Sequence, residues 1–263
     1  MILITSRENH KLKLLTKLKQ KKYREKHKIF ILEGIRSVEQ AIDNNMSMES
    51  IFVSASFQHE NSKMCHDIAK KASCEIYSVE DNILKTVFDT VTPQGIIALA
   101  KIEDVDYASI DYEKTRRIVF LDRVQDPGNL GTIARTADAA GYDLLVLSKG
   151  CADIYSPKAV RSTMGSILNI KIIANVDSKN FIEFIKDKGY ELISSSLEGS
   201  SNYKCVQLQG KAVIVFGNEG SGIENSILDA SDHLVKIPIY GKAESLNVSV
   251  AAGILLYHFS PEY

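Results

Sequence analysis

Three polar, glycine-containing stretches in the second half of the chain have the residue types that chemistry requires. They are LDRVQDPGNLGTIARTADAAG (121–141), VIVFGNEGSGIEN (213–225) and VKIPIYGKAESLNVSVAAGILLYH (235–258). Each begins within or just after an apolar run that is typical of a buried strand. Because ligands bind beyond the carboxyl ends of the strands in open α/β sheets, we expect the three stretches to converge on one site.

The first stretch offers a candidate phosphate ligand on the polar face of a helix. Asp126, Pro127 and Gly128 predict a turn, with Asn129 where the helix begins. Arg135 and Asp138 are neighbours opposite the apolar face, so the Arg135 guanidinium could hold a phosphodiester bidentately. Spacing alone nevertheless favours an ordinary surface ion pair between these two residues.

The second stretch is not typical of a nucleotide-phosphate loop. It contains neither G-x-x-x-x-G-K-[ST] nor a G-x-G-x-x-G that opens a helix, and the central carboxylate of Glu219 would repel phosphate. The glycines allow close approach of the backbone, which could read a flat base or ribose through its N–H and C=O groups. Spacing leaves this interpretation and a plain strand–turn–helix, with Glu219 near a helix N-terminus, equally open.

The third stretch places small and polar residues directly before an apolar helix. Ser245 and Asn247 can cap that helix, which is their ordinary structural role. Ala251, Ala252 and Gly253 permit close packing of the helix against a neighbour, either within the chain or from a second subunit.

These stretches belong to the second of two blocks in which strand and helix signals alternate. The first block predicts strands over 28–34, 50–56, 74–79 and 95–102, with helices after Gly34, over 60–72, and from a Ser78 cap through Phe88. The second predicts strands over 117–121, 143–147, 170–174, 190–196, 211–216 and 233–239. Its helices cover 127–141, run from Ser156 and Pro157 through Met164, follow a Ser178 cap, and cover 247–257. Strands separated by helices predict a mainly parallel sheet covered on both faces.

An acidic segment separates the two blocks. EDVDYASIDYEKT (103–115) lacks sustained periodicity and is the best candidate for a domain linker. We therefore expect domains over residues 1–104 and 116–263, with a linker over 105–115.

Charge is distributed unevenly along the chain. The net charge is −1, yet residues 1–30 hold ten lysines and arginines against two glutamates. Such a basic arm favours contact with RNA or DNA. The alternative is a solvated amphipathic helix that packs Leu12, Leu15 and Leu18 inward, and the two interpretations are compatible.

Other features point to an ordinary globular protein of the cytoplasm. No apolar stretch approaches the ~20 residues that a membrane span needs, and the first residues do not have the pattern of a secretory signal. The four cysteines, at positions 65, 74, 151 and 205, form no C-x-x-C pair. We expect free, buried or half-buried thiols in a reducing compartment.

Taken together, the three stretches resemble the SpoU/TrmH-type RNA ribose 2′-O-methyltransferases of the SPOUT superfamily, in order and in spacing. The N-terminal part, ITSRENHKLKLLTKLKQKKYREKHKIFILEGIRSVEQAI, looks like the substrate-binding domain often joined to them. The resemblance implies a two-domain α/β protein. Its N-terminal domain would be a ribosomal-protein-like α/β RNA-binding domain with a basic arm, and its C-terminal SPOUT domain would have a mainly parallel sheet and a deep trefoil knot.

The resemblance also implies an activity and a set of residues. S-adenosylmethionine would lie bent in the knot and methylate a ribose 2′-hydroxyl without a metal, in 23S ribosomal RNA rather than transfer RNA. The motif positions that match the family's catalytic residues are Asn129, Arg135, Glu219, Ser245 and Asn247. Those that match its cofactor-binding residues are Gly217, Asn218, Gly220, Ile237, Leu246 and Asn247. Candidate RNA ligands in the N-terminal part are Arg7, Lys11, Lys21, Lys22, Arg24 and Arg36.

In this family Arg135 would touch the phosphate next to the target ribose and help to activate the hydroxyl. Its high pKa makes orientation and charge stabilisation safer roles than general base. The active site is usually built across a homodimer, with this arginine supplied by the other subunit. Three alternatives remain open. The first is a transfer RNA 2′-O-methyltransferase. The second is a non-catalytic RNA-binding protein, which cofactor binding would exclude, and the third is a nucleotide-dependent oxidoreductase, which the missing dinucleotide fingerprint disfavours.

Overall fold

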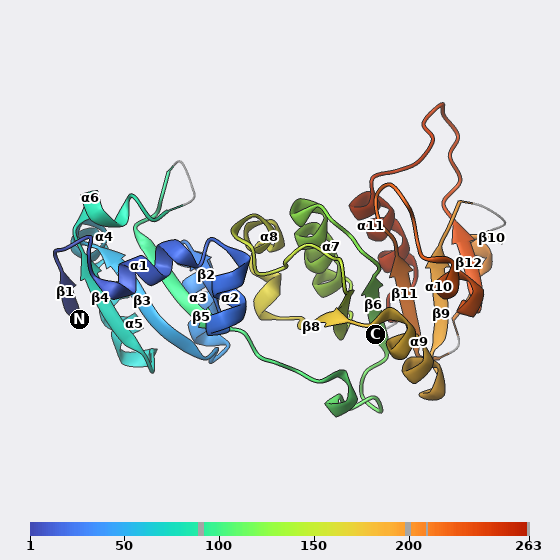
Figure 1. Ribbon diagram of the computed structural model, residues 1–263, viewed down its shortest axis with the longest axis horizontal. Helices are drawn as coiled ribbons and strands as arrows, with labels where there is room; N and C mark the ends of the chain where they lie inside the picture. The colour runs from blue at the N-terminus through green and yellow to red at the C-terminus, as the bar shows by residue number, and fades with distance from the viewer. Residues whose placement is uncertain (89–91, 198–200, 209, 262–263) are drawn as a thin grey trace. The chain divides into compact units, whose positions relative to one another are not determined.

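The computed structural model describes residues 1–88, 92–197, 201–208 and 210–261 (Figure 1). The chain divides into two compact units. The first comprises Met1–Glu103 together with Tyr155–Leu168, and the second comprises Asp104–Ile154 together with Asn169–Tyr263.

A seven-stranded sheet forms the centre of the second unit, in the order β10–β12–β9–β11–β6–β7–β8 (Figure 1). All six neighbouring pairs are parallel, which confirms the predicted parallel sheet. The strands are β6 (Arg117–Leu121), β7 (Leu144–Ser148), β8 (Lys171–Val176), β9 (Glu191–Ser195), β10 (Ser201–Asn202), β11 (Ala212–Phe216) and β12 (His233–Lys236).

Helices cover both faces of this sheet, as predicted. Ile118 and Phe120 of β6 lie in one buried cluster with Phe181 and other residues of two helices, α9 and α10. Because successive strand residues point to opposite faces, Val119 faces the other side. There α7 and α11 pack against each other, and α11 also packs against β11. The helices are α7 (Pro127–Ala139), α9 (Ser178–Asp187), α10 (Asn225–Ala230) and α11 (Val248–His258).

The acidic segment before β6 packs as part of the second unit. Tyr112 is buried, and its hydroxyl donates to the Tyr107 carbonyl oxygen at 2.8 Å. The Tyr107 ring in turn meets Phe181 edge-on, with ring centroids 5.6 Å apart. Aromatic residues therefore fix a segment whose charge suggested only a linker.

The first unit has a five-stranded mixed sheet in the order β1–β4–β3–β5–β2. β1, β4 and β3 are parallel, whereas β5 is antiparallel to both β3 and β2. The strands are β1 (Ile2–Ile4), β2 (Ile29–Glu33), β3 (Met48–Ser54), β4 (Glu75–Val79) and β5 (Ile96–Lys101).

The helices of the first unit pack on this sheet through apolar stripes. Leu12, Leu15 and Leu18 are buried in one cluster with Phe52 and other strand residues, which confirms that they point inward. The helix α3 packs against β2, β5 and α5. The segment 155–168 contributes α8, which packs against β2. The helices are α1 (His10–Lys17), α2 (Lys21–His27), α3 (Ile35–Asp43), α4 (Ala55–Glu60), α5 (Ser62–Lys71), α6 (Asp81–Leu84) and α8 (Pro157–Thr163).

Two predicted helix caps are wrong. Ser78 lies in β4, where its hydroxyl donates to Gln58 Oε1 at 2.7 Å, and α6 begins only at Asp81. Ser178 is the first residue of α9, and the cap is Asp177, whose side chain accepts from the Asn180 N–H. Ser and Asp are comparable caps, so adjacent candidates cannot be ranked from their types.

Three strand and helix boundaries also differ from expectation. β1 was not predicted, because Ile2 and Leu3 are exposed and give no alternating pattern. β3 ends at Ser54, whose side chain caps α4 instead of continuing the strand. β12 ends at Lys236 rather than at residue 239.

The cysteines and the helix lengths complete this description. All four cysteines are free, as predicted, although Cys205 is exposed. Within the part of the chain that the structure describes, no helix combines the length and the apolarity that crossing a membrane requires.

Candidate active site

The three polar stretches converge at the carboxyl ends of four adjacent strands of the second unit. These strands are β12, β9, β11 and β6, in that order across the sheet. The ends of β9 and β11 and the segment after β12 line a pocket of about 520 Å³. This volume lies in the range of ~300–1,000 Å³ that small-molecule sites occupy.

Every residue predicted to bind the cofactor lines this pocket. Gly217, Asn218 and Gly220 follow β11, Ile237 follows β12, and Leu246 and Asn247 precede α11. Its lining comprises residues 195–197, 216–220, 222, 223, 237, 239, 244–248 and 251. The residues from 195 to 197, at the end of β9, were not predicted. Nothing in their sequence indicates a binding role, because three small or apolar residues at the end of a strand are typical of any loop.

The loop after β11 folds tightly back on itself. A β-carbon at Gly217 would lie 2.3 Å from the Gly222 carbonyl carbon, so no other residue fits there without moving the backbone. Asn218 and Gly222 form an antiparallel bridge. The Asn218 N–H donates to the Gly222 carbonyl oxygen and the Gly222 N–H donates to the Asn218 carbonyl oxygen, with N to O distances of 3.1 and 3.0 Å. Asn218 Oδ1 accepts from the N–H groups of Gly220 and Ser221, both at 2.9 Å. The glycines therefore serve a close approach of backbone to backbone.

Glu219 joins this loop to the first stretch. Its carboxylate accepts hydrogen bonds, each of 3.1 Å, from the backbone N–H groups of Gln125 and Asp126 and from Asn129 Nδ2. Asn129 Oδ1 then accepts from Asn247 Nδ2 at 3.0 Å. A chain of three side chains, Glu219–Asn129–Asn247, thus connects all three stretches.

The charge of Glu219 is stabilised by this arrangement. Burial opposes ionisation, but the hydrogen bonds from Asn129, Gln125 and Asp126 outweigh it and hold the pKa of Glu219 below its ordinary value of 4.5. The Glu219 carboxylate is therefore ionised at neutral pH.

We expect this contribution to stability to disappear in acid. Because the folded pKa is depressed, the contribution is complete above 4.5 and is lost as the pH falls through the folded pKa. The difference in Tm between the wild type and Glu219→Gln should stay constant above that pH and close below it. Differential scanning fluorimetry from pH 7 down into the acid range checks this, and a difference that stays constant down to the pH at which the wild type unfolds would contradict it.

Asn247 and Ser245 have different structural roles. Asn247 is the N-cap of α11, and its Oδ1 accepts from the N–H groups of Ser249 and Val250 at 2.9 and 3.4 Å. Ser245 lines the pocket and does not cap the helix. Its hydroxyl is therefore available to a ligand.

Arg135 lies apart from the pocket of its own chain. It is exposed on α7, six residues and about 9 Å along the helix axis from Asn129. The expected surface pair with Asp138 is wrong, because Asp138 Oδ2 accepts from Asn169 Nδ2 at 2.9 Å. Among the described residues the Arg135 guanidinium has no ion-pair or hydrogen-bond partner. A free guanidinium of this kind can bind a phosphate.

The predicted RNA ligands of the first unit fall into two groups. Arg24 is buried, and its Nη1 donates to the Leu18 carbonyl oxygen at 2.6 Å, so it stabilises the fold and is not kept as a ligand. Lys11 is largely enclosed between Glu49 and Glu75, at 3.2 and 3.8 Å. The exposed candidates are Arg7, Lys21, Lys22 and Arg36.

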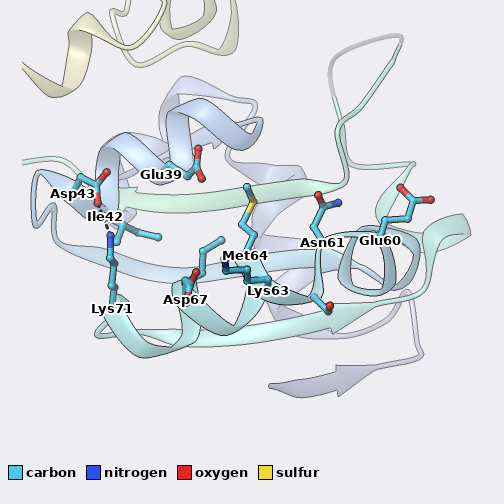
Figure 2. Close-up of a pocket in the computed structure, with 11 residues that line it drawn as sticks. Glu39, Ile42, Asp43, Glu60, Asn61, Lys63, Met64, Asp67 and Lys71 are labelled. Atoms are coloured by element: carbon cyan, nitrogen blue, oxygen red, sulfur yellow. Dashed lines mark hydrogen bonds and ion pairs between the residues drawn. The ribbon is translucent and has the colours of Figure 1, made fainter.

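A second pocket, in the first unit, has the wrong charge for RNA. Figure 2 shows Glu39 and Asp43 of α3 and Asp67 and Lys71 of α5 around this space of about 480 Å³. Lys71 Nζ pairs with Asp43 at 2.9 Å. With Glu60 as well, carboxylates outnumber lysines in the lining. This face would repel phosphates, so we place RNA elsewhere on the unit.

Comparison with known proteins agrees with this geometry. A profile of the SpoU rRNA Methylase family matches residues 116–257, and a profile of the MRM3-like substrate binding domain matches residues 9–98. The chain is 34% identical over 255 residues to the 23S rRNA (guanosine(2553)-2′-O)-methyltransferase RlmP of Bacillus subtilis strain 168. The match covers 97% of this chain and 98% of that protein.

Solved structures show the same fold. The AdoMet-bound rRNA methyltransferase from Sinorhizobium meliloti matches with a TM-score of 0.88 and 29% identity, over 97% of this chain and 95% of that one. A solved RNA 2′-O ribose methyltransferase matches with a TM-score of 0.80 and 28% identity, over 97% of both chains. The chain therefore belongs to the SpoU rRNA methylase family.

Proposed function

We propose that this protein transfers a methyl group from S-adenosylmethionine to a ribose 2′-hydroxyl of 23S ribosomal RNA in the cytoplasm. The observation that carries the proposal is the pocket at the strand ends, which all six predicted cofactor residues line. The related RlmP is a 23S rRNA 2′-O-methyltransferase. The family membership and the pocket thus point to the same chemistry.

The residues of the pocket fit the cofactor. The backbone groups of the loop at Gly217 can approach a flat adenine closely, because no side chain intervenes. Ile237, Ile239 and Leu246 supply an apolar lining against which the adenosine can pack. When bound, S-adenosylmethionine supplies an electrophilic methyl group on a sulfonium, and this transfer needs no metal.

The side chains around the pocket orient the reaction. The carboxylate of Glu219 is held by three donors and has a lowered pKa, so it is a weak base and an organiser. Asn129 and Asn247 fix the start of α7 relative to the start of α11. Arg135 binds the phosphate beside the target ribose and stabilises the charge that develops on the 2′-oxygen as it attacks the methyl group, while the sulfonium sulfur leaves as a neutral thioether and the hydroxyl proton passes to solvent water.

The site is completed across a homodimer in this proposal. Arg135 is absent from the lining of its own pocket, which supports its supply by a second subunit. Val250 and Tyr257 of α11 are large apolar side chains that are 51% and 59% exposed, as expected of a contact surface. The C-terminal segment would form the trefoil knot.

RNA is held by the first unit through its basic arm. Lys17, Lys22 and Lys26 are exposed on or beside α1 and α2. Changing all three to glutamine should weaken RNA binding and reduce the slope of log K against log salt by about 2 units, at ~0.7–0.9 per phosphate contact. Filter binding over a series of salt concentrations measures this.

A matched control removes the same charge elsewhere in the first unit. Lys63, Lys70 and Lys71 lie on α5, near the acidic pocket. Their replacement by glutamine should leave the slope unchanged. If the two triple variants had equal slopes, the basic arm would be a solvated helix face that does not contact RNA.

The function is tested by mapping ribose methylations in total RNA from a deletion strain and its parent. One 2′-O-methyl group in 23S ribosomal RNA should be missing from the deletion strain and should return with the wild-type gene. Loss of a methyl group from transfer RNA instead would reassign the substrate. If calorimetry detected no binding of S-adenosylmethionine, the protein would be a non-catalytic RNA-binding protein.

A further inference from the structure

One buried charge in the second unit has no role in the site described so far. Asp122 directly follows β6 and has no exposed surface, and among the residues that the structure describes it is the one buried carboxylate. A buried carboxylate is costly unless it is paired and fully hydrogen-bonded. Its partners therefore indicate which part of the structure it organises.

The first partner of Asp122 is its neighbour along the chain. Arg123 binds it bidentately, with Nε to Oδ1 at 3.0 Å and Nη2 to Oδ2 at 2.7 Å. Arg123 has a positive φ of 55°, which a side chain other than glycine adopts at a cost. Ser148 accepts from the Arg123 N–H at 2.9 Å and holds this backbone in place.

Three further hydrogen bonds join the pair to the loop after β11. Asp122 Oδ2 accepts from the Glu224 N–H at 2.9 Å, and Arg123 Nη2 donates to the Gly222 carbonyl oxygen at 3.4 Å. The Arg123 carbonyl oxygen accepts from Asn218 Nδ2 at 2.9 Å. The pair thus holds both ends of the loop whose middle lines the pocket.

We propose that Asp122 and Arg123 form a positioning pair that keeps the loop 217–224 in the conformation that binds the cofactor. The inference rests on the proposed function, because it assigns the pair to S-adenosylmethionine affinity. Without the pair, the loop would occupy the binding conformation only part of the time. The apparent Kd would then rise by the inverse of that fraction, so a loop that is ordered about one tenth of the time binds about tenfold more weakly.

The test compares Asp122→Asn with a matched control in the same unit. Asp232 also accepts a backbone N–H, from Leu192 at 2.8 Å, and pairs with a cation, Lys186, at 3.0 Å. It touches no part of the loop. Asp122→Asn should raise the Kd for S-adenosylmethionine at least about tenfold and raise its KM in parallel. The KM for RNA and the kcat at saturating cofactor should change little, and Asp232→Asn should leave all four values unchanged.

A second variant guards against misfolding. The double variant Asp122→Asn, Arg123→Gly removes both charges together, so no buried carboxylate is left without its cation, and it also relieves the positive φ of residue 123. Hydrogen exchange of the ligand-free proteins adds a readout that needs no cofactor. Asp122→Asn and the double variant should speed exchange within 217–224 and leave the strands protected.

The outcomes separate this inference from the proposed function. A wild type that binds no S-adenosylmethionine would refute the function, while hydrogen exchange would still decide whether the pair holds the loop. A wild type that binds the cofactor, beside folded variants that bind it equally well, would overturn the positioning role. Unchanged exchange in the loop would overturn it as well.

Discussion

Replacing Arg135 with alanine is expected to reduce methyl transfer by about 10²–10³-fold, the usual loss when one charge-stabilising donor is removed from an active site. The guanidinium is exposed and unpartnered among the described residues, so its removal breaks no contact within the chain. The Tm and the affinity for S-adenosylmethionine should therefore match the wild type. Single-turnover methylation of RNA with labelled cofactor measures the loss.

The control for this variant is a second exposed arginine of the same unit. Arg116 precedes β6 at the opposite end of the strand from the pocket, and its hydrogen bonds among the described residues are made by its backbone, whose N–H donates to Asp143 and whose carbonyl oxygen accepts from Ala212 and Arg117. Arg116→Ala should turn over normally. Near-normal turnover of Arg135→Ala would remove Arg135 from the mechanism.

Subunit mixing shows on which subunit Arg135 acts. Arg135→Ala has an intact cofactor pocket but lacks the arginine, and Gly217→Ala has the arginine but a defective pocket. Each variant alone should therefore be inactive. If the arginine comes from the other subunit, each mixed dimer has one complete site, and equal mixing restores about one quarter of the wild-type activity. No recovery after mixing by unfolding and refolding would place the arginine in its own subunit's site, and an active monomer would refute the dimer.

The sequence predicted the second unit well because its strands are buried on both faces. Such strands are continuous apolar runs with clear ends, so the predicted positions of β6, β7 and β11 are correct to within a residue. Helix caps were predicted less reliably. Ser156 and Asn247 do cap their helices, but Ser78 and Ser178 do not. The cap is the residue at which the backbone changes from extended to helical, and residue type alone does not fix that position.

The site was predicted from its three stretches, but the pairing of individual side chains was not. Lys11 is enclosed by Glu49 and Glu75, which lie far along the chain. Neither these partners nor the burial of Arg24 can be seen in a local run of basic residues. Asp122 is visible in the sequence as an acidic residue directly after a buried strand. Its role cannot be predicted from that position, because its partner Glu224 lies about a hundred residues later in the chain.

Gly217→Ala is expected to abolish cofactor binding at working concentrations. A β-carbon there would lie 2.3, 2.4 and 2.6 Å from backbone atoms of Gly222 and Ile223. Backbone cannot move aside as a flexible side chain can, so the loop must open. Overpacking costs about 1–3 kcal/mol, and a loop that opens to relieve it loses up to about 100-fold in affinity. Calorimetry with S-adenosylmethionine measures the change.

The same substitution at a second glycine of this unit separates the clash from a general effect of adding a methyl group. Gly210 precedes β11, at the other end of the strand from the pocket, and an added β-carbon there has no neighbour within 4 Å. Gly210→Ala should bind the cofactor normally. Because the Gly217 clash lies within one loop, the sheet should stay folded and its far-UV circular dichroism unchanged. A Gly217→Ala protein that is folded and retains wild-type affinity would show that the loop binds the cofactor without its tight backbone contact, which would remove the reason for a glycine at this position.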